Sequence, residues 1–359
     1  MKPIEGDLVL GREAPVGDVI RVPNTPRVCL GQRTVLIRPD PNRVDPRFLQ
    51  YWLIGPDAQS DMRGRAAGAT VAHLNVEDIR ELDVVGMLND RRQQRTIGSV
   101  LGAIDDLIEN NRRRIALLEQ MAQAIYREWF VHLRYPGHEG DELVDSPLGP
   151  IPKGWEVVPL SDSASISRQN VQPSRSADLD FEHFSIPNFD EGGLPRWENG
   201  VSIRSGKYLV SAGSVLVSKL NPRIRRVWLV EPSTNDRSVA STEFLVLRPK
   251  GGWSLELLYL MLQGTLFQEQ LIGLSGGTST SHQRAKPTDF MALNVVKPPD
   301  GLLSEASKTV KPVIRSAGAL RVQAALATEV RDLLLPKLVT GAIDVSHVHL
   351  EAFLEDTAA

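Results

Sequence analysis

The sequence predicts an α+β protein in which two similar mixed α/β domains are separated by two long helices. Three observations indicate this fold class: the chain repeats itself, each repeat contains short apolar runs bounded by Gly and Pro, and each repeat ends in a long amphipathic segment. The clearest such segment is 102–130, GAIDDLIENNRRRIALLEQMAQAIYREWF, which contains no proline and has apolar residues every three or four positions. This spacing is typical of a helix, and its length exceeds what a compact domain needs.

Short segments of the first third of the chain recur in the same order at an offset of 207 to 211 residues. The matched pairs are GDLVLGREAP (6–15) with GSVLVSKLNP (213–222), TVLIRP (34–39) with FLVLRP (244–249), AGATVAH (67–73) with GGTSTSH (276–282), and LDVV (82–85) with LNVV (293–296). The third pair aligns His73 with His282. A helical pattern follows each copy, so the order predicts a tandem duplication of one mixed domain plus one long helix.

The two copies are unequal in length. Residues 155–212 of the second copy have no counterpart in the first. We therefore expect either an N-terminally incomplete first domain or missing strands that are supplied from elsewhere.

Within each copy, short apolar runs predict strands and longer ones predict helices. Strands are predicted for GDLVLG, TVLIRP, GSVLVSK, RRVWLVE and TEFLVLRP, and helices for DPRFLQYWLIGPDAQSDM and SLELLYLMLQGTLFQEQL. The Pro/Gly-rich stretch PIPKGWEVVPLSD (150–162) predicts a linker that leads into the second domain. The predicted parts are a first domain at 1–88, a spacer helix at 89–135, a linker at 136–154, a second domain at 155–300, a second long helix at 301–345 and a tail at 346–359.

Both long helices carry an apolar seam at heptad spacing, which favours pairing of one helix with the other. The seam residues are Ile97, Leu101, Ile104, Ile108, Asn111, Ile115, Leu118, Ile125 and Trp129 on the first helix and Val313, Leu320 and Leu334 on the second. A polar residue in a seam, here Asn111, commonly fixes register and partner choice. Pro312 is expected to kink the second helix or to mark the start of its regular part.

A helix of about 40 residues is roughly 60 Å long. Paired as an antiparallel coiled coil, two such helices would hold two similar domains apart, related by a pseudo-twofold axis. Such a rigid spacer suits a partner with two like sites a fixed distance apart, and duplex DNA is the commonest such partner.

Composition and charge fit a soluble cytoplasmic protein that contacts a polyanion locally. Apolar residues make up 42% and charged residues 24% of the chain, with a single cysteine, Cys29, that favours a reducing compartment. No apolar run has membrane-spanning length, and the N-terminus lacks a signal-peptide pattern. The net charge is −3, yet residues 201–230 contain six Lys/Arg and no acid.

Basic and hydroxyl-rich loops supply the candidate DNA contacts, because Lys and Arg neutralise phosphates while Arg and Asn can also bond base edges. The candidates are Lys219, Asn221, Arg223, Arg225 and Arg226 in SKLNPRIRR, Thr278, Ser279, His282, Arg284 and Lys286 in SGGTSTSHQRAKP, and Arg12, Arg63, Arg65 and His73 in the first copy. The alternative interpretation of each loop is a solvated charged surface, and of each histidine a structural group. Arg112–Arg114 similarly form either a solvated helix face or a docking site for an acidic partner.

Three segments resemble the specificity subunit of type I restriction-modification systems: LGAIDDLIENNRRRIALLEQMAQAIYREWFV, PLGPIPKGWEVVPLSD and LLLPKLVTGAIDVS. The resemblance covers essentially the whole chain. It implies a non-catalytic DNA-reading subunit with two target recognition domains, each reading half of a split site, and helices that set the gap. It also implies recruitment of two modification (methyltransferase) subunits and two restriction subunits, which would carry S-adenosylmethionine, ATP and Mg²⁺, with no cofactor or metal on this chain.

The sequence contains no recognisable enzyme motif. G-x-G-x-x-G, a Walker loop, HExxH and zinc-spaced Cys/His clusters are all missing, and LNPR (220–223) departs from the amino-methyltransferase motif. We therefore expect no catalysis by this chain. The alternative function is a coiled-coil scaffold that joins proteins without reading bases, and a stand-alone nuclease or methyltransferase is a third possibility.

Overall fold

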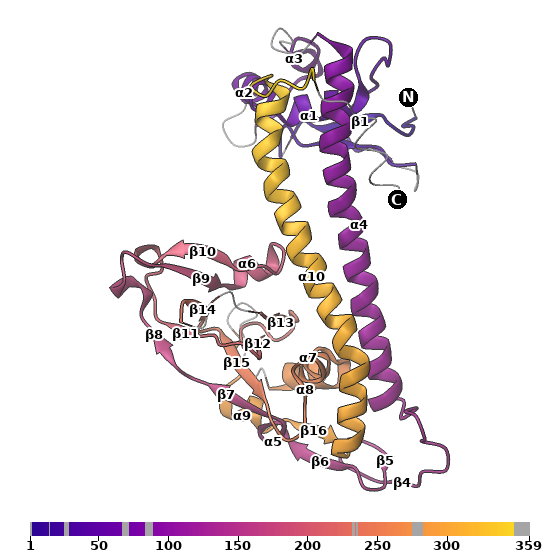
Figure 1. Ribbon diagram of the computed structural model, residues 1–359, viewed down its shortest axis with the longest axis vertical. Coiled ribbons are helices and arrows are strands. Elements are labelled where there is room, and N and C mark those ends of the chain that lie inside the picture. The colour runs from indigo at the N-terminus through magenta and orange to yellow at the C-terminus, as the bar shows by residue number, and fades with distance from the viewer. Residues whose placement is uncertain are drawn as a thin grey trace. The chain divides into compact units, whose positions relative to one another are not determined.

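The computed structural model describes residues 2–13, 15–24, 29–66, 72–82, 89–231, 234, 236–274 and 283–347. The chain forms two compact units: Met1–Arg114 with Ala319–Ala359 make up unit 1, and Ile115–Gly318 make up unit 2. The two long helices are α4 (Arg91–Phe130) and α10 (Asp300–Val339) (Figure 1). Residues 91–114 of α4 and 319–339 of α10 belong to unit 1, and the remainder of each helix belongs to unit 2.

Unit 1 contains a small antiparallel sheet with three short helices. The sheet has the order β2-β1-β3, and its strands are β1 (Leu8–Gly11), β2 (Val19–Arg21) and β3 (Thr34–Ile37). The helices are α1 (Pro46–Ile54), α2 (Pro56–Arg65) and α3 (Val76–Arg80). Alternate strand residues such as Leu8 and Leu10 are fully buried, because they pack against Phe48 of α1 and Leu101 of α4.

The long helices run antiparallel within unit 1. Asp105 of α4 pairs with Arg331 of α10 at 3.0 Å, and Asn111 Nδ2 donates to Gln323 Oε1 at 3.1 Å. The residue numbers of α10 therefore decrease along the contact as those of α4 increase. Asn111 is 1% exposed. The buried seam residues of this unit are Ile97, Leu101, Ile108, Asn111 and Leu320, while Ile104 and Leu334 are half-buried.

Unit 2 contains two larger sheets that pack face to face. The four-stranded sheet has the order β13-β12-β15-β7, and the five-stranded sheet has the order β10-β9-β14-β11-β8. Their strands are β7 (Ala164–Ser167), β8 (Asn170–Val171), β9 (Asp180–Phe184), β10 (Arg196–Asn199), β11 (Lys207–Leu209), β12 (Ser214–Ser218), β13 (Val227–Val230), β14 (Ser238–Ser241) and β15 (Phe244–Pro249). Leu216, Trp228 and Val246 of the first sheet share a core with Phe184 and Ala240 of the second.

The other face of the four-stranded sheet is covered by helices. Val215 and Leu247 belong to a core that also contains Leu257 of α7 (Leu255–Gln263), Tyr126 of α4 and Val310 of α10, so the long helices take part in this unit as well. The remaining seam residues, Ile115, Leu118, Ile125, Trp129 and Val313, are half-buried here. The further elements are β4 (Leu143–Val144), β5 (Ile151–Pro152), β6 (Glu156–Pro159), α5 (Leu160–Ser163), η1 (Pro173–Arg175), α6 (Ile186–Asp190), η2 (Gly200–Ser202), α7 (Leu255–Gln263), α8 (Thr265–Gly273), α9 (Pro287–Met291) and β16 (Asn294–Lys297).

The predicted duplication is visible element by element. The order β2-β1-β3 of unit 1 corresponds to β13-β12-β15 of unit 2, and each long helix has 40 residues. The helix pair after each sheet breaks at a glycine, Gly55 or Gly264, whose backbone N–H caps the preceding helix. The first helix of each pair begins at a side-chain cap, Asp45 or Ser254, since these residues satisfy free amide groups.

The boundaries of the long helices differ from the predicted spacers. Helix α4 ends at Phe130, and Leu133 soon afterwards has a φ of 60°, which a helix does not permit. Helix α10 begins at Asp300 and continues through Pro312, so Pro312 does not mark its start. It ends at Val339, shortly before Gly341 with a φ of 75°, because glycine adopts the left-handed conformation without strain. In unit 1 the described residues contain no counterpart of the five-stranded sheet.

Candidate nucleic-acid interface

The loop that follows β12, residues 219–226, lies beside residues 283–286, although the two segments are far apart in the sequence. Asn221 N–H donates to the Gln283 carbonyl at 2.9 Å, and Ala285 N–H donates to the Lys219 carbonyl at 3.0 Å. Leu220 and Arg284 form an antiparallel bridge at the same place. The fold therefore joins two of the segments that the sequence predicts to contact DNA, and we refer to them together as the basic loop site (219–226 and 283–286).

The first segment of this site is held in one conformation by local hydrogen bonds. Asn221 has a φ of 48°, and Ile224 N–H donates to its carbonyl at 2.8 Å, which closes a tight turn. Ser218 N–H donates to the Arg226 carbonyl at 3.0 Å, so the turn closes on the end of β12. Buried Gln268 of α8 also donates its amide to the Pro222 carbonyl. The loop is a rigid part of the fold.

Arg226 anchors the loop from beneath. Its Nε and Nη2 donate to the two carboxylate oxygens of Asp190, at the end of α6, at 2.7 Å each, and its side chain is only 8% exposed. The hydrogen bond from Arg226 holds the pKa of Asp190 below its ordinary value. Arg226 is buried and held by both oxygens of the partly exposed Asp190, so this residue positions the loop and is not displayed toward a ligand.

Arg284 is paired as well, but at the surface. Its Nε and Nη2 donate to Glu243 at 3.0 and 2.9 Å, while the Glu243 carbonyl accepts from Lys219 N–H. The hydrogen bond with Glu243 raises the pKa of Arg284. Because the pair is exposed, a phosphate could compete for the guanidinium at small cost.

Arg223 and Arg225 are the two free arginines among the described residues of the basic loop site. Both are exposed, flank the exposed Ile224, and form no ion pair within the part of the chain that the structure describes. Lys286 is likewise exposed and unpaired among these residues, and Lys219 is half-buried. Two unpaired arginines can bind phosphate or a guanine edge. Because hydrogen bonds already hold the loop in place, binding does not incur the conformational-entropy cost of ordering a flexible segment.

The first copy builds the same loop with less free charge. Leu74 N–H donates to the Arg12 carbonyl at 2.9 Å, and Glu13 forms a backbone bridge with His73. This bridge corresponds to the one between Leu220 and Arg284 in the second copy. His73 is therefore structurally equivalent to Arg284, whereas the sequence predicts that it aligns with His282. Glu13 lies 3.9 Å from Arg12 and 3.4 Å from Arg33, so an acid partly neutralises this loop.

The other predicted DNA contacts of the first copy, Arg63, Arg65 and His73, do not form one positively charged patch among the described residues. Arg63 is exposed on α2, whereas Arg65 pairs with Asp61 at 2.7 Å and lies 3.7 Å from Glu81. His73 is half-buried. In the second copy, Thr278, Ser279 and His282 fall outside the described residues.

A positioning residue that the sequence comparison overlooked is shared by both copies. Gln59 of α2 donates to the Gly17 carbonyl at 2.7 Å, just as Gln268 of α8 donates to the Pro222 carbonyl. The two glutamines follow Gly55 and Gly264 by four residues each. Extending the repeat alignment into the short helices would have found them, whereas Asp190 and Glu243 have no such signal.

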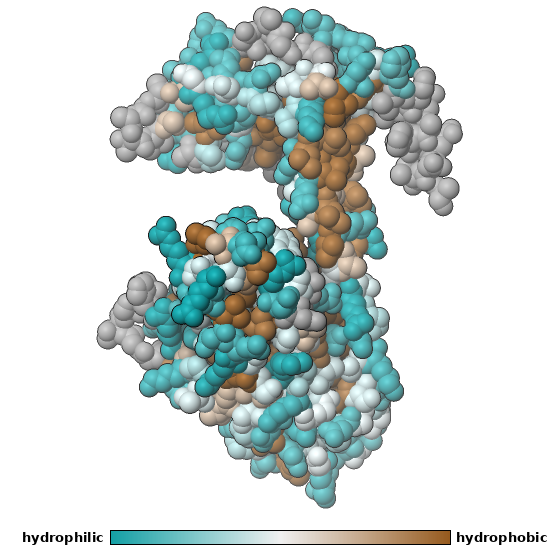
Figure 2. All heavy atoms as spheres, turned by 60° about the vertical axis from the view of Figure 1, so that its left-hand side comes forward, coloured by the Kyte–Doolittle hydropathy of each residue, from teal (hydrophilic) through white to brown (hydrophobic). Residues whose placement is uncertain are grey.

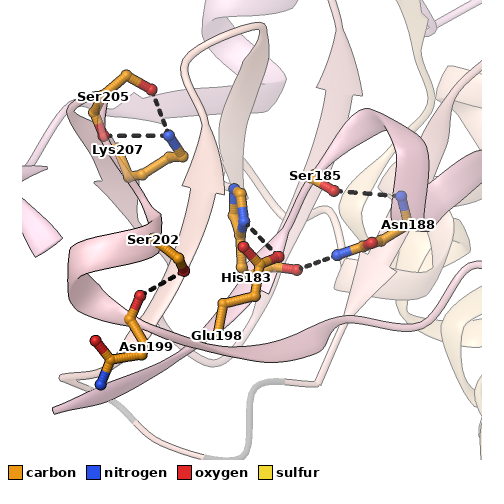
Figure 3. Close-up of polar contacts among 8 residues, drawn as sticks. All are labelled: His183, Ser185, Asn188, Glu198, Asn199, Ser202, Ser205 and Lys207. Carbon is orange, nitrogen blue, oxygen red and sulfur yellow. Dashed lines mark hydrogen bonds and ion pairs between the residues drawn. The ribbon is translucent and has the colours of Figure 1, made fainter. Parts of the chain in front are cut away.

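A second polar group is buried within the five-stranded sheet (Figure 3). His183 of β9 bonds through Nδ1 to Glu198 of β10 at 3.0 Å, and its Nε2 is buried without a partner among the described residues. Lys207 of β11 is 6% exposed and donates to the Ser205 hydroxyl at 2.6 Å. Burial lowers the pKa of His183, with a further contribution from the charge of Lys207, and burial also lowers the pKa of Lys207.

This arrangement predicts a pH-dependent stability of unit 2. Because the folded pKa of His183 lies below its unfolded value of about 6.5, its contribution is complete above that pH and is lost as the pH falls through the folded pKa. We expect the free energy of unfolding, measured by urea denaturation, to fall below pH 6.5 more steeply in the wild type than in His183→Gln. His132→Gln, at an exposed histidine, is the matched control. Equal slopes for the wild type and His183→Gln would contradict the assignment.

Within the described residues, no cluster of His, Cys, Asp or Glu has the composition of a metal site. The helices of that part of the chain also lack one that is long and apolar enough to cross a membrane.

Comparison with known proteins identifies the relatives of this chain. It is 24% identical over 359 residues to the type I restriction enzyme MjaIX specificity subunit of Methanocaldococcus jannaschii, covering 96% of this chain and 79% of that protein. It is 24% identical over 381 residues to the HindI specificity subunit of Haemophilus influenzae, covering 86% and 80%. Its curated relatives are type I restriction enzyme specificity subunits. No family model matches the chain.

The fold is similar to that of a solved structure. The S subunit of a type I restriction-modification system from M. genitalium superposes with a TM-score of 0.61 at 14% identity, covering 96% of this chain and 84% of that one. The predicted fold class and family resemblance are thus confirmed. The names of the relatives also agree with the prediction of a specificity subunit in place of an enzyme.

Proposed function

We propose that this chain is the DNA-reading specificity subunit of a type I restriction-modification complex, with one half of a bipartite DNA site read by each mixed domain. The observation that carries the proposal is the basic loop site: Arg223 and Arg225 are exposed and unpaired within the described residues, on a loop that Gln268 and Arg226 hold rigid. The names of the relatives support the same function.

The experiment that tests this function is a salt titration of binding to random duplex DNA. A protein that neutralises several phosphates loses affinity steeply with salt, with a log–log slope of about −0.9 per phosphate contact. We expect such a slope for the purified chain in complex with its modification subunits. A protein scaffold, the alternative function, would bind duplex without a measurable slope or not at all.

The long helices support the recruitment of partner subunits, because part of their exposed surface is apolar. In unit 1, α10 exposes Val322, Leu326, Val330 and Leu333, which recur at helical spacing and are 54%, 56%, 47% and 65% exposed. Figure 2 shows hydrophobic side chains at the surface of the long helices. A contiguous apolar stripe on a helix is typical of a docking surface.

The repeat supplies a second stripe in unit 2. Leu117 and Met121 of α4 are 64% and 46% exposed, and they occupy the positions that correspond to Leu326 and Val330 of α10. Each unit would thus bind one modification subunit, which supports a ratio of two per chain. Restriction subunits would join this assembly, and S-adenosylmethionine, ATP and Mg²⁺ would be bound by the partners.

Charged substitutions in the stripes are expected to remove modification subunits one at a time. Leu326→Glu with Val330→Glu should lower the modification-to-specificity ratio from about two to about one, because a charge cannot be buried unpaired in an apolar interface. Leu117→Glu with Met121→Glu should do the same, and all four together should abolish the complex. Native mass spectrometry of co-expressed subunits measures the ratio.

Leu143→Glu, at an exposed leucine outside the helices, is the control and should leave the ratio unchanged. If the fourfold variant still binds two modification subunits, the stripes are not the docking surfaces.

A further inference from the structure

A cavity of about 430 Å³ lies in unit 2 between α4, α8, β16 and the basic loop site. Its floor is apolar and partly aromatic, since the buried residues that line it are Tyr126, Phe130, Met261, Phe267 and Val295, each at most 9% exposed. Exposed residues line it as well, so the cavity is open to solvent. Its size is in the range of pockets that bury a ligand or an anchoring side chain.

Side-chain amides hold the walls of this cavity in place. Gln123 Nε2 of α4 donates to Gln263 Oε1 of α7 at 3.3 Å, and Gln270 Nε2 of α8 donates to the Asn294 carbonyl of β16 at 3.0 Å. Each hydrogen bond joins two of the elements that form the cavity. The cavity therefore exists before anything binds in it, and binding does not require its walls to be ordered first.

The rim of the cavity is apolar and positively charged. Leu266 and Val131 line it and are 44% and 54% exposed. Arg127 and Arg225 also line it, are exposed, and form no ion pair within the part of the chain that the structure describes. Glu119 is the one acid among the described lining residues. An aromatic floor below free guanidinium groups is complementary to an aromatic side chain that neighbours a carboxylate.

The rim has no counterpart of the same chemistry in unit 1. A constant offset of 209 residues relates α1, α2 and α4 to α7, α8 and α10. At this offset the equivalent of Arg127 is Pro336, and the equivalent of Leu266 is Asp57. A side chain that suits the cavity of unit 2 would therefore meet neither the cation nor the apolar rim at the equivalent place in unit 1.

The apolar stripes proposed as docking surfaces are unequal in the opposite sense. Leu333 is 65% exposed and extends the stripe of unit 1, but its equivalent on α4 is the half-buried Ala124. The stripe of unit 2 contains only Leu117 and Met121, so a protein docked there would bury less apolar surface on the helix. Gln120 lies one turn from Leu117 on α4 and lines the cavity, so the cavity borders this shorter stripe.

We propose that the cavity receives an anchoring side chain of the modification subunit that docks on unit 2, namely an aromatic residue flanked by Asp or Glu. The inference rests on the proposed function, because it names a contact of the same docking partner. The ring would fill the aromatic floor, and the carboxylate would pair with Arg127 at the rim. An anchor in a preformed pocket compensates for the shorter stripe of unit 2. Because Arg225 belongs to both the rim and the basic loop site, the anchor would lie beside the bound DNA.

Filling the cavity is expected to remove one modification subunit. Ala116 is exposed and lines the cavity, so Ala116→Trp would occupy the space of the anchor and leave the stripe intact. Arg127→Glu would repel the carboxylate. We expect either variant to weaken binding to unit 2 by roughly tenfold or more, as for the loss of a buried aromatic anchor. Native mass spectrometry at limiting concentrations of the modification subunit should show a ratio of about one in place of about two.

Matched controls make the same substitutions on unit 2 outside the cavity. Ala177→Trp and Arg175→Glu are at exposed residues and should keep the ratio at about two. Combining Ala116→Trp with the unit 1 stripe variant, Leu326→Glu with Val330→Glu, should abolish the complex. Combining it with Leu117→Glu and Met121→Glu should leave one modification subunit bound, because both changes act on unit 2.

A crosslink identifies the side chain that enters the cavity. A photoreactive benzophenone amino acid in place of Leu266 should crosslink to the modification subunit, and mass spectrometry of the crosslinked peptide should show an aromatic residue flanked by Asp or Glu. The same amino acid in place of Leu143, which is exposed and outside the cavity, should give no such crosslink.

The outcomes separate this inference from the proposed function. If the wild-type chain binds no modification subunit, the proposed function fails and the inference fails with it. If the wild type binds two but Ala116→Trp binds two with unchanged affinity, or the crosslinked peptide has no aromatic residue beside an acid, the inference alone is overturned.

Discussion

Replacing Arg223 and Arg225 by alanine is expected to weaken duplex binding and to lower the magnitude of the salt slope by up to about two units, roughly one per lost phosphate contact. Both side chains are exposed and unpaired within the described residues, so the substitution removes charge without breaking an internal bond. If one of them contacts a base edge, its single substitution should also relax specificity by about 1–3 kcal/mol. Fluorescence anisotropy at several salt concentrations measures both effects.

The matched control removes the same charge elsewhere on unit 2. Arg134 and Arg196 are exposed and paired with Glu128 and Glu191, at 2.5 and 2.6 Å, so their double alanine variant changes net charge equally. It should retain the wild-type slope. Equal losses in the two double variants would mean that net charge, and not the basic loop site, determines affinity.

Replacing Asp190 by alanine is expected to destabilise unit 2 and to release the loop. Arg226 would keep its charge at 8% exposure without a carboxylate partner. Removing one partner of a buried pair costs about 3–5 kcal/mol, but Asp190 is 44% exposed, so a loss of about 1–3 kcal/mol is the reasonable expectation. Urea denaturation measures the stability, and limited proteolysis at Arg223 and Arg225 reports the loop.

The control replaces both partners. In Asp190→Leu with Arg226→Met, no charge is left buried, and such replacements are often close to neutral. Recovery of most of the lost stability would confirm that the unpaired arginine is the cause. If Asp190→Ala is as stable as the wild type, the pair does not anchor the loop.

The different burial of Arg226 and its neighbours Arg223 and Arg225 illustrates a limit of sequence reasoning. All three are arginines within four residues, and the basic run predicts one cluster of DNA contacts. Burial distinguishes them, because Arg226 is buried against Asp190 at the end of α6, a helix more than 30 residues earlier in the chain. The pairing of Arg284 with Glu243 has the same origin.

The sequence by itself determined the properties that arise from neighbours along the chain. Strands such as β12 and β15 and the seam around Asn111 follow from apolar spacing, which acts over a few residues. The break of each predicted helix at Gly55 or Gly264 was seen only in the structure. The duplication followed from order and offset, which need no coordinates.

Only the tertiary structure decided which side chains meet. It joined residues 219–226 to 283–286, aligned His73 with Arg284, and placed Gln59 and Gln268 under corresponding loops. These contacts join residues tens to hundreds of positions apart, and their energies depend on distance and burial, which a linear pattern does not contain.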